Sequence, residues 1–131
     1  MRVFKTKAFN RFARKEDLRD KMLAKAVADI ERGLIDALLG GGLVKQRLAR
    51  PGAGKRGGYR TIIAYRMGET AVFLFGFAKN EQANISHEDE RDLKDYGALL
   101  LALGEKERKL MIDNGELWEV PYDKENEKTS Q

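Results

Sequence analysis

The chain has 131 residues and a mass of 14.9 kDa, which is the size of one domain. It contains no cysteine, which excludes disulfides, thiolate metal ligands and a cysteine nucleophile, and its single histidine argues against a structural zinc site. The longest apolar run, residues 98–103, is far shorter than the ~20 residues that span a bilayer. No signal peptide follows the charged N-terminus, so we expect a cytoplasmic protein without a membrane partner.

The charge is unevenly distributed along the chain. Residues 1–80 hold 18 Lys and Arg against 7 Asp and Glu, a net +11, whereas residues 81–131 hold 7 against 14, a net −7, which together give the overall +4. Residues 37–68 contain no acid and seven cations: Lys45, Arg47, Arg50, Lys55, Arg56, Arg60 and Arg66. This local excess of positive charge favours a polyanionic partner, above all nucleic acid. Two alternatives are a solvated basic face balanced by the acidic half, and a surface for an acidic protein.

The first forty residues predict a strand followed by a long helix. Val3–Lys7 partly alternates and is compatible with a first strand. Apolar residues then recur at spacings of three and four over Lys15–Gly33, which predicts an amphipathic helix. The helix either runs on or breaks briefly near Gly33, and the apolar pattern continues through Leu34–Leu39 until Gly40–Gly42 end it.

The middle of the chain predicts three strands. Leu43–Ala49 alternates between cationic and largely apolar positions, and the glycine-rich Arg50–Gly58 is expected to be a loop. Tyr59–Arg66 and Ala71–Lys79 are strands joined by a short turn, which makes a hairpin. The second of them should present three aromatic rings on one face as core: Phe73, Phe75 and Phe77.

The C-terminal part predicts two more helices. Ser86 followed by Asp89 resembles a helix cap, and the apolar positions behind it predict a helix that Gly104 ends. A short helix over Lys106–Asn114 and an extended segment over Glu116–Tyr122 follow, and residues 123–131 should be a disordered tail. We therefore predict one α+β domain over residues 1–122, with a small antiparallel sheet, N-terminal helices on one side and C-terminal helices after it.

The strand order predicts where the cations meet. In an antiparallel meander the end of Ala71–Lys79 lies beside the start of Tyr59–Arg66, so Arg60 and Lys79 approach each other. Lys45 and Arg47 lie one strand further across, and the tyrosines of the hairpin lie nearby. Grouped cations can stabilise the extra negative charge of a phosphorane and lower the pKa of a lysine toward that of a general base. Aromatic rings near them could stack an unpaired base.

Two short motifs lie within this region. The segment Gly-Lys-Arg-Gly-Gly-Tyr-Arg-Thr-Ile-Ile at 54–63 and the segment Phe-Leu-Phe-Gly-Phe-Ala-Lys-Asn-Glu at 73–81 resemble the RelE/ParE superfamily of bacterial toxins, most closely its HigB-like branch. The resemblance covers about residues 1–103 and implies a RelE-like α+β fold. It also implies cleavage of mRNA in the ribosomal A site, without a metal or other cofactor, by attack of a 2′-hydroxyl on its neighbouring phosphate.

The resemblance assigns roles by position. Arg60 matches the strand arginine that stabilises the phosphate, and Lys79 matches the basic residue at the end of the next strand. Lys45 and Arg47 fall where the family places its base and phosphate-binding cations. The predicted catalytic residues are therefore Lys45, Lys55, Arg60 and Lys79, and the predicted RNA-binding residues are Arg47, Arg50, Arg56, Tyr59, Asn80 and His87.

Two departures from the family pattern leave the proton donor open. Many ribosome-dependent members have a second arginine after the lysine, where this chain has Asn80, and some have a tyrosine where it has Ser86 and His87. The donor to the leaving 5′-oxygen is His87, Lys79 or no residue at all. The favoured interpretation of His87 from the sequence is a solvated or capping residue at the helix start. Arg60 may be a surface residue in a cross-strand pair, although the nearby sequence offers it no acid.

The resemblance implies a toxin of a type II toxin–antitoxin system that cuts translated mRNA on the ribosome. Its partners would be mRNA, the ribosome and a cognate antitoxin, in the HigB-like case a helix-turn-helix protein, with operator DNA bound only through the toxin–antitoxin complex. Two alternatives share the fold. One is a ParE-type inhibitor of DNA gyrase, and the other is a non-catalytic relative that binds only an antitoxin and DNA.

Overall fold

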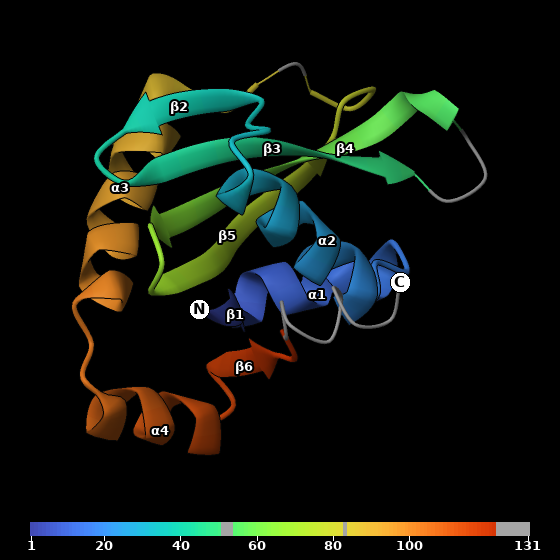
Figure 1. Ribbon diagram of the computed structural model, residues 1–131. Helices are drawn as coiled ribbons and strands as arrows, with labels where there is room; N and C mark the ends of the chain where they lie inside the picture. The colour runs from blue at the N-terminus through green and yellow to red at the C-terminus, as the bar shows by residue number, and fades with distance from the viewer. Residues whose placement is uncertain (51–53, 83, 123–131) are drawn as a thin grey trace.

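The computed structural model describes residues 1–50, 54–82 and 84–122, with the backbone alone at 50 and 54–57 (Figure 1). The elements run in the order β1 (Arg2–Thr6), α1 (Lys7–Lys15), α2 (Asp20–Glu31), β2 (Ala37–Gly40), β3 (Leu43–Arg50), β4 (Gly54–Arg66), β5 (Thr70–Ala78), α3 (His87–Leu101), α4 (Glu105–Asp113) and β6 (Leu117–Val120). The predicted α+β class is confirmed. The predicted tail, residues 123–131, lies outside the described residues.

The six strands form one sheet in the order β2-β3-β4-β5-β1-β6. Its pairs are antiparallel except for β1 and β5, which run parallel. The sheet is therefore mixed, where the sequence predicted an antiparallel one. Strand β1 lies between β5, to which it is parallel, and β6, to which it is antiparallel.

Helices α1 and α2 cover one face of the sheet, as the sequence predicted (Figure 1). The hydroxyl of Thr6 accepts a hydrogen bond from the Phe9 amide at 3.2 Å and caps α1 at its start. Phe9 is fully buried and its ring lies 5.0 Å from that of Phe73 in β5. The other face is covered by α3, whose Gly97 permits close contact with Ala64 and Leu74.

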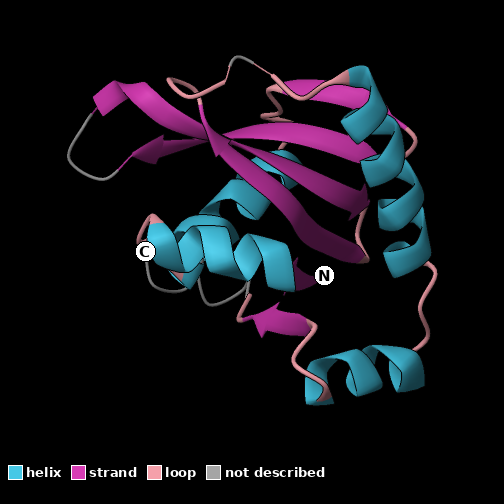
Figure 2. Cartoon of the chain, turned by 180° about the vertical axis from the view of Figure 1, so that it is seen from behind, coloured by secondary structure: helices cyan, strands magenta, loops and turns pink. Residues whose placement is uncertain are grey.

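Helix α3 covers only one end of its face of the sheet. Gly97 lies close to Leu43 at the start of β3, Ala64 near the end of β4 and Leu74 in the middle of β5. Figures 1 and 2 both show α3 at one end of the strands and the far ends of β3 and β4 at the opposite end. The predicted cap is confirmed, because the Ser86 hydroxyl accepts from the Asp89 amide at 3.0 Å.

The predicted helix over Lys15–Gly33 was wrong in its extent. The chain forms two helices, α1 and α2, separated by a turn in which Asp17 has a positive φ of 56°. The sequence analysis missed α1, whose inner side chains Phe9 and Ala13 are buried against the sheet. The apolar residues after Gly33 do not extend the helix either. They form β2 at the sheet edge, because Gly33 at φ 83° reverses the chain first.

Two predictions about the strands also need correction. Residues 54–58, predicted as loop, begin β4, while 51–53 lie outside the described part of the chain. The three phenylalanines of β5 do not share a face, because the register between β4 and β5 shifts between Ile62 and Ile63. Phe73 packs in the cluster under α1 and α2, whereas Phe75 packs in the cluster under α3. The extra residue of this bulge moves one ring to the opposite face.

Gly76 in β5 gives a test of how tightly α1 packs. A Cβ built at this position would lie 2.5 Å from two ring carbons of Phe12, so no side chain fits without movement. Gly76→Ala should lower the free energy of unfolding by about 1–3 kcal/mol, measured by urea denaturation. Adding Phe12→Leu should recover part of the loss, since the ring is the obstacle. Wild-type stability in Gly76→Ala alone would contradict this packing.

Candidate functional site: a cationic face of the sheet

The alternation of β4 directs Arg60 away from α1 and α2. Tyr59 and Ile63 belong to the core under those helices, whereas Ile62 and Ala64 belong to the core under α3. Arg60 lies between Tyr59 and Thr61, two positions before Ile62, so its side chain shares the face of Ile62. That face is the one that α3 leaves uncovered beyond the end of its contacts.

Two neighbouring strands bring further cations to this face. Arg47 in β3 is directly opposite Arg60, and Phe77 in β5 flanks Arg60 on its other side. Lys79 follows Phe77 by two residues, and its amide donates to the Gly58 carbonyl at 3.2 Å, so the pairing continues past the end of β5. Diagonal neighbours of this kind lie about 7–8 Å apart. The end of β5 therefore lies beside the start of β4, as the sequence predicted, and the approach of the Arg60 and Lys79 side chains stays a prediction.

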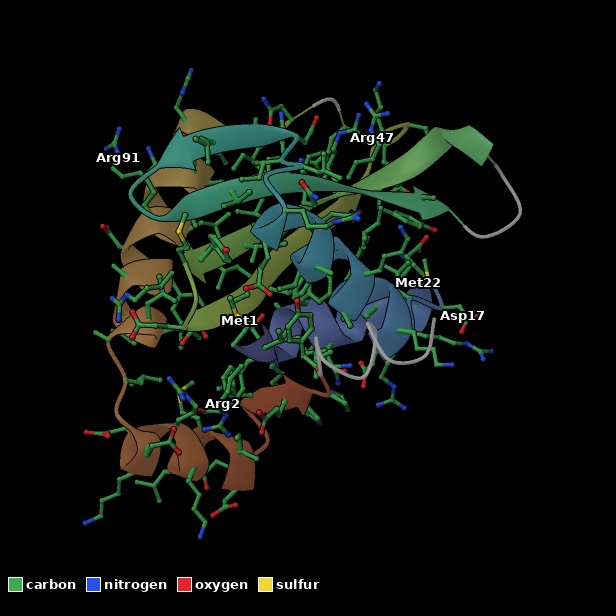
Figure 3. All side chains as sticks on the ribbon, in the orientation of Figure 1. Met1, Arg2, Asp17, Met22, Arg47 and Arg91 are labelled. Atoms are coloured by element: carbon green, nitrogen blue, oxygen red, sulfur yellow. The ribbon has the colours of Figure 1, made fainter. Side chains whose placement is uncertain are left out.

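Lys45 completes a group that we call the cationic face: Lys45, Arg47, Arg60 and Lys79. Lys45 lies opposite Ile62 on the same side of β3 as Arg47. Arg47 and Lys79 are exposed and Lys45 is half-buried, and Figure 3 shows Arg47 beside β3 and β4. Like charges that face each other across strands repel, so this face favours binding of an anion.

Arg60 differs from the other cations because it is buried. Only 8% of the residue is exposed, and its Nε lies 3.5 Å from the carboxylate of Asp36. That distance is longer than a strong N–H···O hydrogen bond, so the contact is mainly electrostatic. No buried side-chain nitrogen or oxygen of the described residues lacks a hydrogen-bond partner. The Arg60 side chain as a whole keeps 10% of its surface exposed.

The buried amide of Gln46 holds the segment that contains Asp36. Gln46 Oε1 accepts from the Asp36 amide at 3.0 Å, and its Nε2 donates to the Leu34 carbonyl at 2.8 Å. Both ends of the turn from α2 into β2 are thereby fixed to β3. Because Asp36 is positioned in this way, its carboxylate stays near Arg60.

The sequence analysis missed both Asp36 and Gln46. It expected no acid near Arg60, and this was wrong because Asp36 directly precedes the acid-free window and returns through the edge strand β2. Gln46 did carry a signal, since it is a polar residue between Val44 and Leu48 on the buried side of β3. Satisfied buried amides of this kind usually fix backbone segments.

Tyr59 lies on the opposite face from the cationic face. It is 2% exposed, its ring packs edge-on against Phe12 at 5.5 Å, and its hydroxyl donates to Glu16 at 2.7 Å. A base cannot stack on a ring with so little exposed surface, so the structure does not fit the prediction that Tyr59 binds RNA. Tyr65 lies on the same buried side, and burial, with Glu31 nearby, raises the pKa of its phenol, which therefore stays protonated at neutral pH.

The remaining predicted site residues have no described side-chain contact with the cationic face. Arg50, Lys55 and Arg56 lie at the outer ends of β3 and β4, where the structure describes the backbone alone. Asn80 is exposed in the turn after β5, and His87 is the exposed first residue of α3, directly after its cap. No hydrogen bond or ion pair within the described part of the chain joins Asn80 or His87 to the cationic face.

A second charge cluster, around Arg2, is structural. Arg2 binds Glu119 at 2.9 Å and Glu105 at 2.6 Å, and Figure 3 shows it beside α4 and β6. The hydrogen bonds that Arg2 donates hold the pKa of Glu119 below its usual value, and their acceptance by Glu119 and Glu105 raises the pKa of Arg2. These contacts tie the acidic C-terminal half to β1 and do not reach the cationic face.

Within residues 1–50, 54–82 and 84–122, no helix is both long and apolar enough to cross a bilayer. The same residues contain no group of three or more His, Asp or Glu side chains that could hold a metal ion.

The mixed sheet, the helices on both faces and the cationic face together define a small α+β protein with a surface for anions. The family described as the RelE toxin of the RelE/RelB toxin–antitoxin system matches residues 1–120. The chain belongs to this RelE toxin family, which makes it a toxin of a toxin–antitoxin system with an antitoxin as its partner. No curated protein matches the sequence. The resemblance to the HigB-like branch stays a prediction.

Gln46 gives a test of the support beneath Arg60. Gln46→Leu leaves the Asp36 amide and the Leu34 carbonyl without partners, and we expect a loss of about 1–3 kcal/mol in the free energy of unfolding by urea denaturation. Gln82→Leu is the control, because Gln82 is exposed and its side-chain amide donates only within its own loop, to the Asn84 carbonyl, among the described residues. It should change stability by less than about 0.5 kcal/mol. Equal stability of the two variants would contradict the proposed role of Gln46.

Proposed function

We propose that this toxin is an endoribonuclease that cuts translated mRNA on the ribosome without a metal ion. Membership of the RelE toxin family supports this, since its toxins are generally endoribonucleases. The observation that supports it most is the direct opposition of Arg47 and Arg60, with Lys79 diagonal to Arg60 on the other side of β4. A phosphodiester bound between these three groups would relieve their mutual repulsion.

The reaction that suits such a face is transesterification within the RNA. The 2′-oxygen forms a bond to the adjacent phosphorus, and the bond from phosphorus to the 5′-oxygen breaks. The proton of the 2′-hydroxyl goes to a base, and an acid or water protonates the leaving 5′-oxygen. The products are a 2′,3′-cyclic phosphate and a 5′-hydroxyl. Negative charge grows on the phosphoryl oxygens in the transition state, where cations bind more tightly than in the ground state.

The structure suggests how the roles are divided. Arg60 is the candidate for the phosphoryl oxygens, because Asp36 and the sheet position its guanidinium and 10% of its side chain stays exposed. Arg47 and Lys79 are exposed and bind the flanking backbone together with Arg56. Lys45 or Lys55 takes the proton of the 2′-hydroxyl. Lys45 already lies on the cationic face, two positions from Arg47.

Substitution of the cationic face tests the proposal. Arg60→Ala should slow cleavage of ribosome-bound mRNA roughly 10²–10³-fold, as for loss of one fixed donor to a developing charge. Lys79→Ala should slow it less, because its exposed charge is screened. Arg91→Ala, which removes an exposed cation from α3, should leave the rate unchanged. The rate is measured by primer extension on a defined mRNA in a reconstituted translation reaction.

The same variants separate cleavage from the two alternatives. If expression arrests growth while mRNA stays intact, and the Arg60→Ala and Lys79→Ala double variant arrests growth equally, the nuclease proposal is wrong. A gyrase inhibitor would then show loss of DNA supercoiling in a purified assay. A relative without activity would show neither growth arrest nor cleavage, yet bind operator DNA together with its antitoxin.

The proton donor can be identified by changing the leaving group. An RNA with sulfur in place of the scissile 5′-oxygen has a leaving group that needs no proton, so a variant without the acid should cleave it at nearly the wild-type rate. We expect Lys79→Ala or His87→Ala to be slow on normal RNA and rescued on the sulfur substrate. Absence of rescue in both variants, measured as the ratio of the two single-turnover rates, means that neither residue is the donor.

We further propose that the antitoxin is a small helix-turn-helix protein and that the toxin contacts operator DNA only through it. The motif at 54–60, which resembles the HigB-like branch, supports this. Coexpression with the product of the adjacent reading frame should abolish growth arrest, and the toxin alone should not shift the promoter DNA. A promoter shift by the toxin alone would contradict the proposal.

A further inference from the structure

A second basic surface lies on the opposite side of the molecule, between α1 and the segment that leads into β6. It is an open groove of about 430 Å³, lined by Lys7, Asn10, Arg11, Arg14, Gly115 and Trp118. Helix α1 packs on the sheet face that contains Phe73 and Tyr59, whereas Arg60 and Lys79 belong to the other face. This α1 groove is therefore separate from the cationic face.

The three cations of the α1 groove form a row. Lys7, Arg11 and Arg14 are spaced i, i+4 and i+7 and so follow one side of the helix, at rises of about 6 and about 10 Å from Lys7. All three are exposed. None of the ion pairs among the described residues includes them, although Arg2, Lys5, Arg32 and others are paired. Their charge is thus uncompensated within that part of the chain.

The opposite wall of the groove is aromatic. Trp118 lies in β6 opposite Lys5 and is half-buried, so part of its indole ring faces solvent. Gly115 leaves room beside it, because a Cβ at that position would meet no atom within 4 Å. At a φ of 72° the position also favours glycine. The groove therefore combines a row of cations with an accessible aromatic edge.

We propose that the α1 groove binds single-stranded RNA, independently of its sequence. A row of cations at helical spacing matches a repeating phosphate backbone better than a single anion, and each phosphate that it neutralises releases counterions. The indole of Trp118 offers a surface on which an unpaired base stacks. An acidic peptide would satisfy the charges but would leave the aromatic wall without a role. The inference goes beyond the proposed cleavage and does not depend on it.

The single tryptophan of the chain provides a direct probe of this groove. A 12-nucleotide 2′-O-methyl oligoribonucleotide cannot undergo attack by its 2′-oxygen, so binding is measured without cleavage. We expect it to quench Trp118 fluorescence in the full-length protein. Lys7→Gln, Arg11→Gln and Arg14→Gln together should weaken the affinity at least tenfold. They should also lower the slope of log K against log salt concentration by about 2, since three phosphate contacts are lost.

Control variants distinguish RNA binding at this groove from binding at the cleavage site and from an effect of net charge. Lys21→Gln, Lys25→Gln and Arg32→Gln remove three exposed cations from the region of α2 and should leave the quenching intact. The double variant Arg60→Ala, Lys79→Ala should also leave the quenching intact. Failure of the groove proposal can therefore be distinguished from failure of the nuclease proposal. Lys7→Gln alone should give an intermediate loss if the triple variant does not fold.

Three outcomes would overturn the proposal. The oligonucleotide may leave Trp118 fluorescence unchanged in the wild-type protein while its own anisotropy shows that it binds. The α1 and α2 triple variants may lose affinity equally, which would make the effect one of net charge. Poly-glutamate may quench Trp118 as strongly as RNA does at equal charge concentration, which would assign the groove to an acidic protein segment.

Discussion

The alternation of side chains along β4 is the constraint from which the site follows. Tyr59 and Ile63 must face α1 and α2 to complete the core, so Arg60 must face the other side of a central strand. A guanidinium in that position needs a partner, and Asp36 at the sheet edge supplies a carboxylate at 3.5 Å. A shift of one residue in the β4 register would bury the charge of Arg60 under α1 and remove the cationic face.

The helices cover the two faces of the sheet unequally, and the two faces therefore have different roles. Helices α1 and α2 cover one face of the sheet, where the ring of Phe9 packs against that of Phe73 in β5. Helix α3 covers only one end of the other face, where Gly97 lies close to the strands. Beyond α3, this face presents Arg47, Arg60 and Lys79 on neighbouring strands, with Arg60 buried and the other two exposed. The acidic charge of the C-terminal half is partly used to hold α4 and β6 to Arg2, so it does not neutralise this surface.

The sequence predicted the parts of the fold that depend on short-range patterns. Alternation in β3 and β4 placed Lys45, Arg47 and Arg60 on adjacent strands, and Ser86 marked the start of α3. The sequence could not show features that depend on contacts between residues far apart in the chain. The bulge that separates Phe73 from Phe75 depends on the register of β4, and the partner of Arg60 comes from an edge strand whose apolar residues also fit a helix. Tyr59 seemed available to RNA because its burial under α1 is a tertiary contact.

The central claim is that Arg47 and Arg60 hold the phosphate backbone of RNA. The most direct measurement is the NMR shift of arginine Nε–Hε resonances as a 2′-O-methyl RNA is added to the full-length toxin. We expect the resonances of Arg47 and Arg60 to move with the same affinity, and those of Arg2 and Arg108, held in ion pairs near α4, to stay in place. RNA binding that leaves Arg47 and Arg60 unmoved would contradict the claim.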